Sequence, residues 1–190
     1  MSDSAAPSKP RRSSADLLLN VGLAAAVVLA FVAWRRARDP HRLWAKRLEQ
    51  EHVTQIEQPI TRCFGGARSD DLRRLTRAVQ GGQMPDPFNR CHSGPMADLL
   101  VAPAGFMQTI QNPPVEVYRL RDRHRASLNR LSASLRSLEL EVSRAHGNPD
   151  TAEKREALVR RLEDVVPELE QERQAFEDMV AGARAAASPF

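Results

Sequence analysis

Two stretches of sequence decide the fold: residues 128–145, LNRLSASLRSLELEVSRA, and residues 158–179, LVRRLEDVVPELEQERQAFEDM. Their apolar residues recur at alternating intervals of three and four positions, which is the spacing of a heptad pattern. The segment 147–149, Gly-Asn-Pro, ends the first pattern, and a capping box at 150–153 begins the second. The sequence therefore predicts two long helices that fold back on each other as an antiparallel, coiled-coil-like hairpin over residues 115–186.

The charges of the two predicted helices favour their pairing. Residues 115–146 carry seven Arg against four acidic residues, whereas residues 150–186 carry six basic against ten acidic residues. Helices of opposite net charge attract each other, and association of like with like is disfavoured. Pro167 departs from the pattern, because a proline inside a helix removes a backbone hydrogen bond. We expect a kink or a break there.

The register of the hairpin places two polar residues opposite each other. If the turn centres on Asn148 and Pro149, residues whose numbers sum to about 297 face one another, so Glu172 lies opposite His124 with Arg121 one turn away. Both heptad patterns become polar at this level. We predict that Glu172 pairs with His124 or a neighbouring Arg and marks the end of the dry core; the alternative is simple fraying of an exposed end.

An uncharged run of 18 residues, LLLNVGLAAAVVLAFVAW, occupies positions 17–34. As an α-helix it would be about 27 Å long, close to the ~30 Å thickness of the hydrocarbon core of a bilayer. Trp34 lies at one end, where its amphipathic ring suits the membrane interface. The sequence predicts a single transmembrane helix over residues 16–34, preceded by a disordered tail at 1–15.

A cleaved signal peptide is the alternative interpretation of this run. The run is longer than the usual apolar region of about 7–15 residues, and no clear small-x-small cleavage site follows it. The orientation of a spanning helix depends on two arguments that conflict. Basic residues are more numerous after the run, which favours a cytoplasmic C-terminal part, whereas the two cysteines favour an oxidising space. We expect the C-terminal domain to be extracytoplasmic.

A basic segment follows the uncharged run and opens the region 35–60. Its charges suit membrane headgroups, either as a plain anchor or as a site for anionic lipid. An amphipathic helix continues to about Gln58, where Pro59 disturbs it. The basic residues expected at the membrane interface are Arg35, Arg36, Arg38, Arg42, Lys46 and Arg47.

The region 61–114 holds both cysteines of the chain and is rich in Pro and Gly. We expect loops and short helices there: one from Ser69 to a stop at Gly81, and two others around 96–100 and 106–110. Cys63 and Cys91 are predicted to form a disulfide with Cα atoms ~4.4–6.8 Å apart. Free thiols are one alternative. Another is a metal site that uses both cysteines, His92 and, earlier in the chain, His52, although no paired-ligand spacing supports it.

Composition and motifs exclude several classes of function. The chain of 190 residues has only 6 Phe, 2 Trp, 1 Tyr and 9 Gly, which argues against a large β-sandwich or barrel. None of the sequence motifs of a nucleophilic, zinc-hydrolase, P-loop or dinucleotide-binding enzyme occurs. We therefore expect no enzyme, no cofactor and no nucleic-acid partner, since the basic excess gathers beside the uncharged run.

The sequence as a whole predicts an all-α protein with one N-terminal transmembrane helix, a Cys-containing region and a long helical hairpin. We expect a single-pass, membrane-anchored interaction or scaffold protein that contacts membrane lipid and binds protein partners through the hairpin. A membrane-anchored redox or metal-binding protein that uses Cys63, Cys91 and His92 is the alternative.

Overall fold

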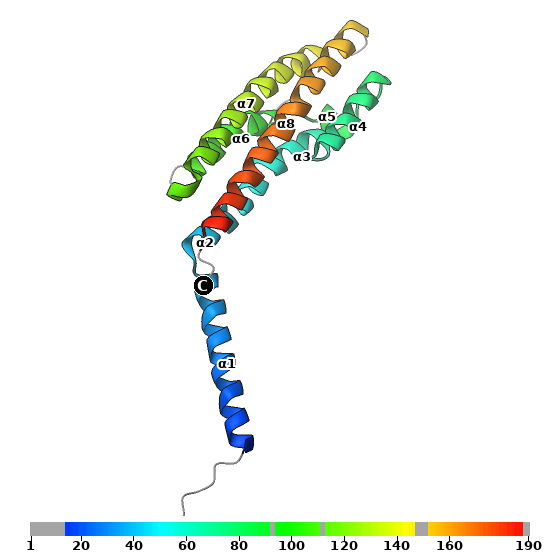
Figure 1. Cartoon of the computed structure of the whole chain (residues 1–190). Helices are drawn as coiled ribbons and strands as arrows, with labels where there is room; N and C mark the ends of the chain where they lie inside the picture. The colour runs from blue at the N-terminus through cyan, green and yellow to red at the C-terminus, as the bar shows by residue number, and fades with distance from the viewer. Residues whose placement is uncertain (1–13, 92–93, 111–112, 147–151, 188–190) are drawn as a thin grey trace, which may run out of the picture. The chain divides into compact units, whose positions relative to one another are not determined.

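The computed structural model describes residues 14–91, 94–110, 113–146 and 152–187, and these residues contain helices but no strand (Figure 1). The chain divides into two units between Asp39 and Pro40. The helices in chain order are α1 (Ser14–Ala37), α2 (Pro40–His52), the π-helical turn η1 (Val53–Glu57), α3 (Gln58–Phe64), α4 (Ser69–Gln80), α5 (Asp86–Asn89), α6 (Gly94–Thr109), the 3₁₀ turn η2 (Val115–Val117), α7 (Tyr118–His146) and α8 (Ala152–Ala186).

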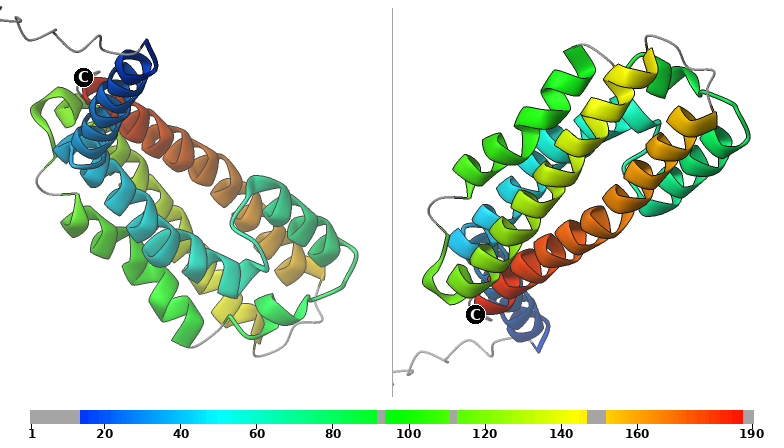
Figure 2. Two further views of the ribbon diagram at one scale, coloured as in Figure 1. Left: turned by 90° about the horizontal axis from the view of Figure 1, so that it is seen from below. Right: turned by 90° about the horizontal axis from the view of Figure 1, so that it is seen from above.

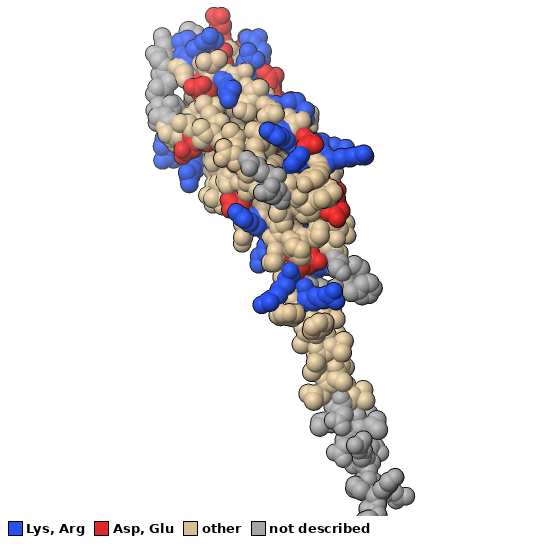
Figure 3. Space-filling view, turned by 90° about the vertical axis from the view of Figure 1, so that its left-hand side faces the viewer, with Lys and Arg blue, Asp and Glu red and all other residues tan. Residues whose placement is uncertain are grey.

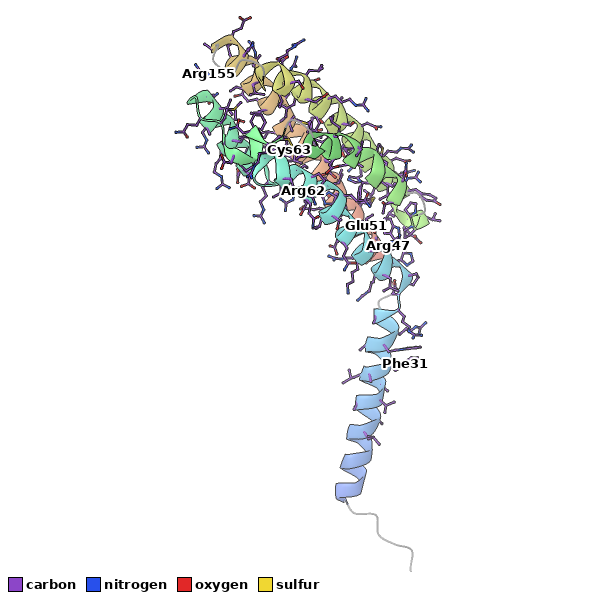
Figure 4. All side chains as sticks on the ribbon, turned by 180° about the vertical axis from the view of Figure 1, so that it is seen from behind. Phe31, Arg47, Glu51, Arg62, Cys63 and Arg155 are labelled. Atoms are coloured by element: carbon purple, nitrogen blue, oxygen red, sulfur yellow. A yellow bond between two sulfur atoms is a disulfide. The ribbon has the colours of Figure 1, made fainter. Side chains whose placement is uncertain are left out.

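The first unit contains α1, a helix of 24 residues. Its apolar side chains from Val21 onward are exposed, Phe31 among them, except that Val32 is half-buried (Figure 4). Phe31 stacks on Trp34, and the Arg38 guanidinium lies 4.6 Å from the centre of the Trp34 ring. In Figure 3 the described apolar part of α1 shows only uncharged atoms. No helix among the described residues is both long enough and apolar enough to span a membrane, so the predicted transmembrane helix at 16–34 is not supported.

The second unit, Pro40–Ala187, is a helical bundle arranged around α8. The longest contact of α8 is with α7, and α4 and α2 pack against its other sides. α6 packs against α7 and α3, which closes the bundle on the side opposite α4 (Figure 2). A single apolar core runs through all of these helices. The fold is therefore all-α, as the sequence predicts.

α7 and α8 are long helices that contact each other along their length. Side chains of both heptad patterns are buried at this contact. Across the surface of the pair, Arg130 donates hydrogen bonds to Glu168 at 3.2 Å and to Gln171 at 3.0 Å, which agrees with an antiparallel register near the predicted sum. The predicted turn at 147–149 lies outside the described residues. The buried apolar heptad residues are Leu128, Leu131, Leu135, Leu138, Val142, Leu158, Leu162, Val165, Leu169, Phe176 and Met179.

α8 continues without a break through Pro167, so the expectation of a break there is wrong. Pro167 is exposed, and the residues on either side of it, Val165, Val166 and Leu169, are buried in the core. A proline in a helix costs roughly 3 kcal/mol. Burial of these apolar neighbours offsets that cost, because each fully buried Val or Leu contributes about 1.5–3 kcal/mol.

α2, η1 and α3 form one continuous helical segment that extends past Pro59 to Phe64, whereas the sequence suggested an end near Gln58. Pro59 has no N–H to donate to the carbonyl four residues earlier. The chain widens into a π turn just before it, in which the Gln58 N–H donates to the Val53 carbonyl. The backbone keeps helical dihedrals at both His52 and Gln58, and the segment therefore passes the proline without ending.

Two helices differ from the sequence-based expectation: α4, which lies between the two cysteines, and α6, which lies between Cys91 and the hairpin. α6 is one helix of 16 residues that runs through the buried Pro103, where two short helices were expected. α4 begins at Ser69 as expected, but its N-cap is Arg68, whose backbone N–H donates to Asp71 at 3.2 Å. Packing of α6 against α7 and α3 supplies the stabilisation that local sequence around Pro103 lacks.

Cys63, at the end of α3, forms a disulfide with Cys91, just after α5, with Cα atoms 4.7 Å apart. The predicted disulfide is therefore confirmed; Figure 4 labels Cys63. Both half-cystines are fully buried. The alternatives of free thiols and of a metal site built on these two cysteines are wrong, because a bonded sulfur offers no thiolate. His92 lies outside the described residues.

Candidate metal centre

Three titratable side chains meet in the core of the second unit: His52 from α2, His124 from α7 and Glu172 from α8. We call them the His–Glu–His cluster. Their exposed fractions are 3%, 0% and 1%, so the cluster has no contact with bulk water. Each residue lies on the buried face of its helix, which explains why three helices from distant parts of the chain bring them together.

One carboxylate oxygen holds the cluster together. Glu172 Oε1 accepts a hydrogen bond from His124 Nε2 at 2.7 Å and another from His52 Nε2 at 3.0 Å. Hydrogen bonds to an ionised acceptor are roughly twice as strong as neutral ones. In a core that excludes water, this arrangement fixes the carboxylate between the two rings.

Two phenylalanine rings enclose the cluster. The His52 ring stacks on Phe176 with ring centres 3.8 Å apart and meets the edge of Phe106 at 5.3 Å. His124 also meets Phe106 in an edge-on contact, at 5.6 Å. Both imidazole planes are therefore held by packing as well as by hydrogen bonds.

Glu57, the last residue of the π turn, brings a second carboxylate to His52. Its Oε1 lies 3.7 Å from His52 Nδ1, on the side of the ring away from Glu172. The two residues are five positions apart, and a π turn with its i→i+5 pattern brings such residues towards one face. His52 therefore has a carboxylate near each of its ring nitrogens.

The histidines keep Glu172 ionised in spite of its burial. Desolvation alone would raise the pKa of this carboxyl group. The hydrogen bonds from His124 and His52, together with their charge interactions, outweigh it and hold the Glu172 pKa at about 2, below the ordinary value of 4.5. The core thus contains a carboxylate at neutral pH.

Two polar atoms of the cluster have no hydrogen-bond partner: Glu172 Oε2 and His124 Nδ1. A buried polar atom without a partner costs about 1–3 kcal/mol. The cluster therefore offers one carboxylate oxygen and one ring nitrogen beyond those that its own hydrogen bonds use.

The donor atoms of the cluster are suited to a cation. Each of the three residues presents one ligand atom, and these atoms all lie within 4.8 Å of one another. Among the described residues this is the one group of three or more His, Cys, Asp or Glu side chains with that geometry. Two imidazoles and one carboxylate are ligands that transition metals bind in proteins.

The structure brings together His124 and Glu172, the two residues predicted to form a polar layer, but it does not place that layer at the end of the dry core. Five apolar residues of α8 beyond Glu172 are buried as well. Arg121 does not join the layer; it pairs with Asp122 at 2.7 Å. The buried residues beyond the layer are Ala175, Phe176, Met179, Val180 and Ala183.

His52 is the member of the cluster that sequence reasoning did not place there. A signal was present, because His52 lies four residues after Leu48 and four before Ile56 on the apolar face of the predicted amphipathic helix. A histidine on such a face faces the core. The sequence did not show that this face would meet the hairpin at the level of Glu172.

The basic residues expected at a membrane interface lie on or beside two helices. Arg35 is exposed on α1 and Arg38 in the turn just after it, while Arg42, Lys46 and Arg47 are exposed on α2. The side chain of Arg36 lies outside the described part. Figure 4 labels Arg47 on α2.

A groove lies on the surface between α4 and α8. Its volume is about 420 Å³, and Arg73, Arg77 and Gln80 of α4 line one side. Glu163 and Val166 of α8 line the other side. At one end Arg73 pairs with Glu170 at 2.7 Å. The groove presents basic side chains above a small apolar floor.

The comparisons with known proteins leave the family of this chain open: no protein-family model, no curated protein and no solved structure matches it.

Proposed function

We propose that this chain is a single-pass, membrane-anchored helical interaction protein whose disulfide-linked bundle lies outside the cytoplasm and binds a protein partner. The observation that carries the proposal is the uncharged run at 17–34, followed in the same chain by a bundle that contains a buried disulfide.

The uncharged run supports the anchoring. The run begins at position 17, four residues before Val21, the first residue whose side chain is described. Seven large apolar side chains between Val21 and Trp34 are at least half exposed. Such a surface is costly in water and suits lipid on all sides.

The disulfide supports the orientation. Disulfides form and persist in oxidising compartments and are rare in the cytosol. A C-terminal bundle that requires Cys63–Cys91 is accordingly expected on the oxidising side of the membrane. The basic residues after the run favour the opposite orientation, but large following domains translocate largely regardless of charge.

The groove between α4 and α8 supports the binding of a partner. Arg77 and Gln80 are exposed along it, and Val166 forms part of its floor. A segment with acidic side chains around one apolar residue would complement these groups. This surface belongs to the hairpin through α8, which the sequence indicated as the partner surface.

Membrane fractionation tests the anchoring. Val27→Arg and Val28→Arg together place two charges in the middle of the run, at about 2.5–3.5 kcal/mol each for insertion. We expect the double variant to leave the carbonate-resistant membrane fraction. Val101→Arg is the matched control, because Val101 on α6 is similarly exposed. Wild-type chain in the soluble fraction would contradict the anchoring.

Thiol trapping in intact cells tests the orientation. Cells are quenched in acid, and free thiols are then labelled under denaturing conditions, with and without prior reduction. We expect Cys63 and Cys91 to be labelled only after reduction, and added protease to digest the bundle when only the outer side is accessible. Two free thiols together with protection of the bundle would place it in the cytoplasm.

Site-specific photo-crosslinking tests the binding. A photoreactive residue at Gln80 should give one adduct of defined mass in membranes, and Arg77→Glu should abolish it. Ser143 on α7, which is exposed and outside the groove, is the control position. No adduct at Gln80, or equal adducts at both positions, would contradict the groove as binding surface and leave the anchoring unaffected.

A further inference from the structure

We propose that the His–Glu–His cluster is a binding site for one divalent first-row transition-metal ion. His52 Nε2, His124 Nε2 and the Glu172 carboxylate would be its protein ligands.

The spacing of the donor atoms is close to what such an ion needs. Ions of this class bind imidazole nitrogen and carboxylate oxygen at about 2.0–2.2 Å, which separates neighbouring ligand atoms by roughly 3–3.5 Å. Glu172 Oε1 lies 2.7 Å from His124 Nε2 and 3.0 Å from His52 Nε2. The first distance is a few tenths of an ångström below this range and the second is at its lower limit, and all three donor atoms lie within 4.8 Å of one another.

Binding of the ion uses an atom that the metal-free cluster leaves unpaired. Glu172 Oε2 has no hydrogen-bond partner, although the residue is buried. A carboxylate that binds a metal through both oxygens would satisfy it. The ion thus completes the coordination of a group that is otherwise costly to bury.

Protons and charge balance without an additional reactant. At each imidazole the Nε2 proton moves to Nδ1, or to water where Nδ1 already carries one, and the Nε2 lone pair binds the metal. At His52 the new Nδ1–H points towards Glu57, whose Oε1 is 3.7 Å away. Metal-bound histidines commonly donate their second N–H to a carboxylate in this way. Glu57 and Glu172 together neutralise the two charges of the ion.

The donor set selects the class of ion. Two nitrogens and one carboxylate favour Zn²⁺, Fe²⁺, Co²⁺ and related ions, whereas Mg²⁺ and Ca²⁺ require six or more oxygen ligands. Phe106 and Phe176 pack against the imidazole rings and hold their planes in place. Three protein ligands would leave at least one coordination position for a further small ligand.

Metal titration of the full-length chain in detergent micelles, purified without a histidine tag and stripped with chelator, tests the proposal. Co²⁺ should give one equivalent of a saturable visible absorption band, and Zn²⁺ should displace it. Mg²⁺ and Ca²⁺ should have no effect. X-ray absorption of the wild-type zinc form should show two imidazoles and oxygen in the first shell, a result that needs no variant to fold.

Single substitutions identify the ligands. His52→Asn, His124→Asn and Glu172→Gln should each weaken Co²⁺ binding more than about 100-fold, and Glu57→Gln about 10–100-fold. The matched control is His41→Asn, because His41 is also on α2 and lies beside a carboxylate, Glu116, but near the surface. Circular dichroism and the intact disulfide establish that each variant is folded.

Two outcomes would overturn the proposal. One is the absence of stoichiometric Co²⁺ or Zn²⁺ binding by the stripped wild-type chain; the cluster is then only a polar layer of the core. The other is binding that persists unchanged in folded Glu172→Gln and His124→Asn variants, which would place the metal elsewhere.

Discussion

Glu172 occupies a heptad position at which an apolar residue ordinarily packs, and two histidines from other helices form hydrogen bonds with its carboxylate. A buried ion pair is weak evidence for stability, because desolvation opposes the attraction. The three residues of the cluster do depend on one another, because removal of one leaves the polar atoms of the others buried without a hydrogen-bond partner. The effect of a Glu172 substitution on stability therefore includes the loss of hydrogen bonds at His52 and His124.

In the metal-free protein, Glu172→Leu should lower the free energy of unfolding by about 3 kcal/mol, because it leaves two imidazole N–H groups buried without an acceptor. The triple substitution His52→Leu, His124→Leu and Glu172→Leu should recover most of this loss. Urea denaturation followed by circular dichroism measures both. An unchanged midpoint for Glu172→Leu alone would mean that the cluster does not influence the packing.

Gly182 on α8 provides a second test at the residue scale. A Cβ atom there would lie 2.6 Å from Leu120 Cδ1 and 3.3 Å from Val117 Cγ1, whereas at Gly105 on α6 it would meet Gln55 Oε1 at 3.6 Å, an ordinary contact. Gly105→Ala should therefore stabilise the protein by about 0.5–1 kcal/mol through helix propensity. Gly182→Ala should give no gain or a loss. Thermal unfolding compares the two, and equal gains would refute the close packing.

The helical elements differ in how far the sequence could predict them. The hairpin helices were predictable because their heptad patterns are local and long, and α4 because its first turn and its stop at Gly81 are encoded nearby. The continuation of α3 past Pro59 and of α6 through Pro103 was not predictable from local rules. In both places contacts with other helices stabilise a backbone that the local sequence disfavours.

Pro167 allows a direct measurement of how much stability a proline costs inside a helix that tertiary contacts support. Pro167→Ala should restore the hydrogen bond to the Glu163 carbonyl and stabilise the protein by roughly 1–3 kcal/mol, since the side chain is exposed and packs in no core. Pro103→Ala on α6 is the contrast, because Pro103 is buried and its removal also loses packing. Denaturant midpoints distinguish the two; no gain at Pro167 would mean that the helix has already adjusted to the proline without cost.

At the scale of the whole molecule, the cluster depends on residues up to 120 positions apart in the chain. The pairing of His124 with Glu172 followed from the hairpin register, because one turn fixes the alignment of two adjacent helices. The position of His52 beside Glu172 depends on how α2 packs on α8. The sequence contains no local pattern that predicts this packing. Tertiary packing of helices from separate regions therefore completes the site.

The division of the chain at Asp39 predicts that the bundle folds without α1. A fragment of residues 40–187 should be helical, form the Cys63–Cys91 disulfide, and unfold in one transition within a few degrees of the full-length chain. Calorimetry and circular dichroism check this. A fragment that is unfolded, or that melts far below the full chain, would show that residues before Pro40 are needed to complete the core.

The π turn at Val53–Glu57 determines where the chain can lose a residue without a change in the helices that follow. A π turn contains one residue more than an α-helix needs between the same two end points. Deletion of the exposed Thr54 should therefore convert this turn to a regular α-helix and leave His52 and Cys63 facing the core. Deletion of the exposed Ala133 from α7 should instead rotate the following heptad residues by about 100° and unfold the hairpin. We therefore expect the bundle to tolerate the loss of one residue at this place, and the melting temperatures of the two deletion variants test this.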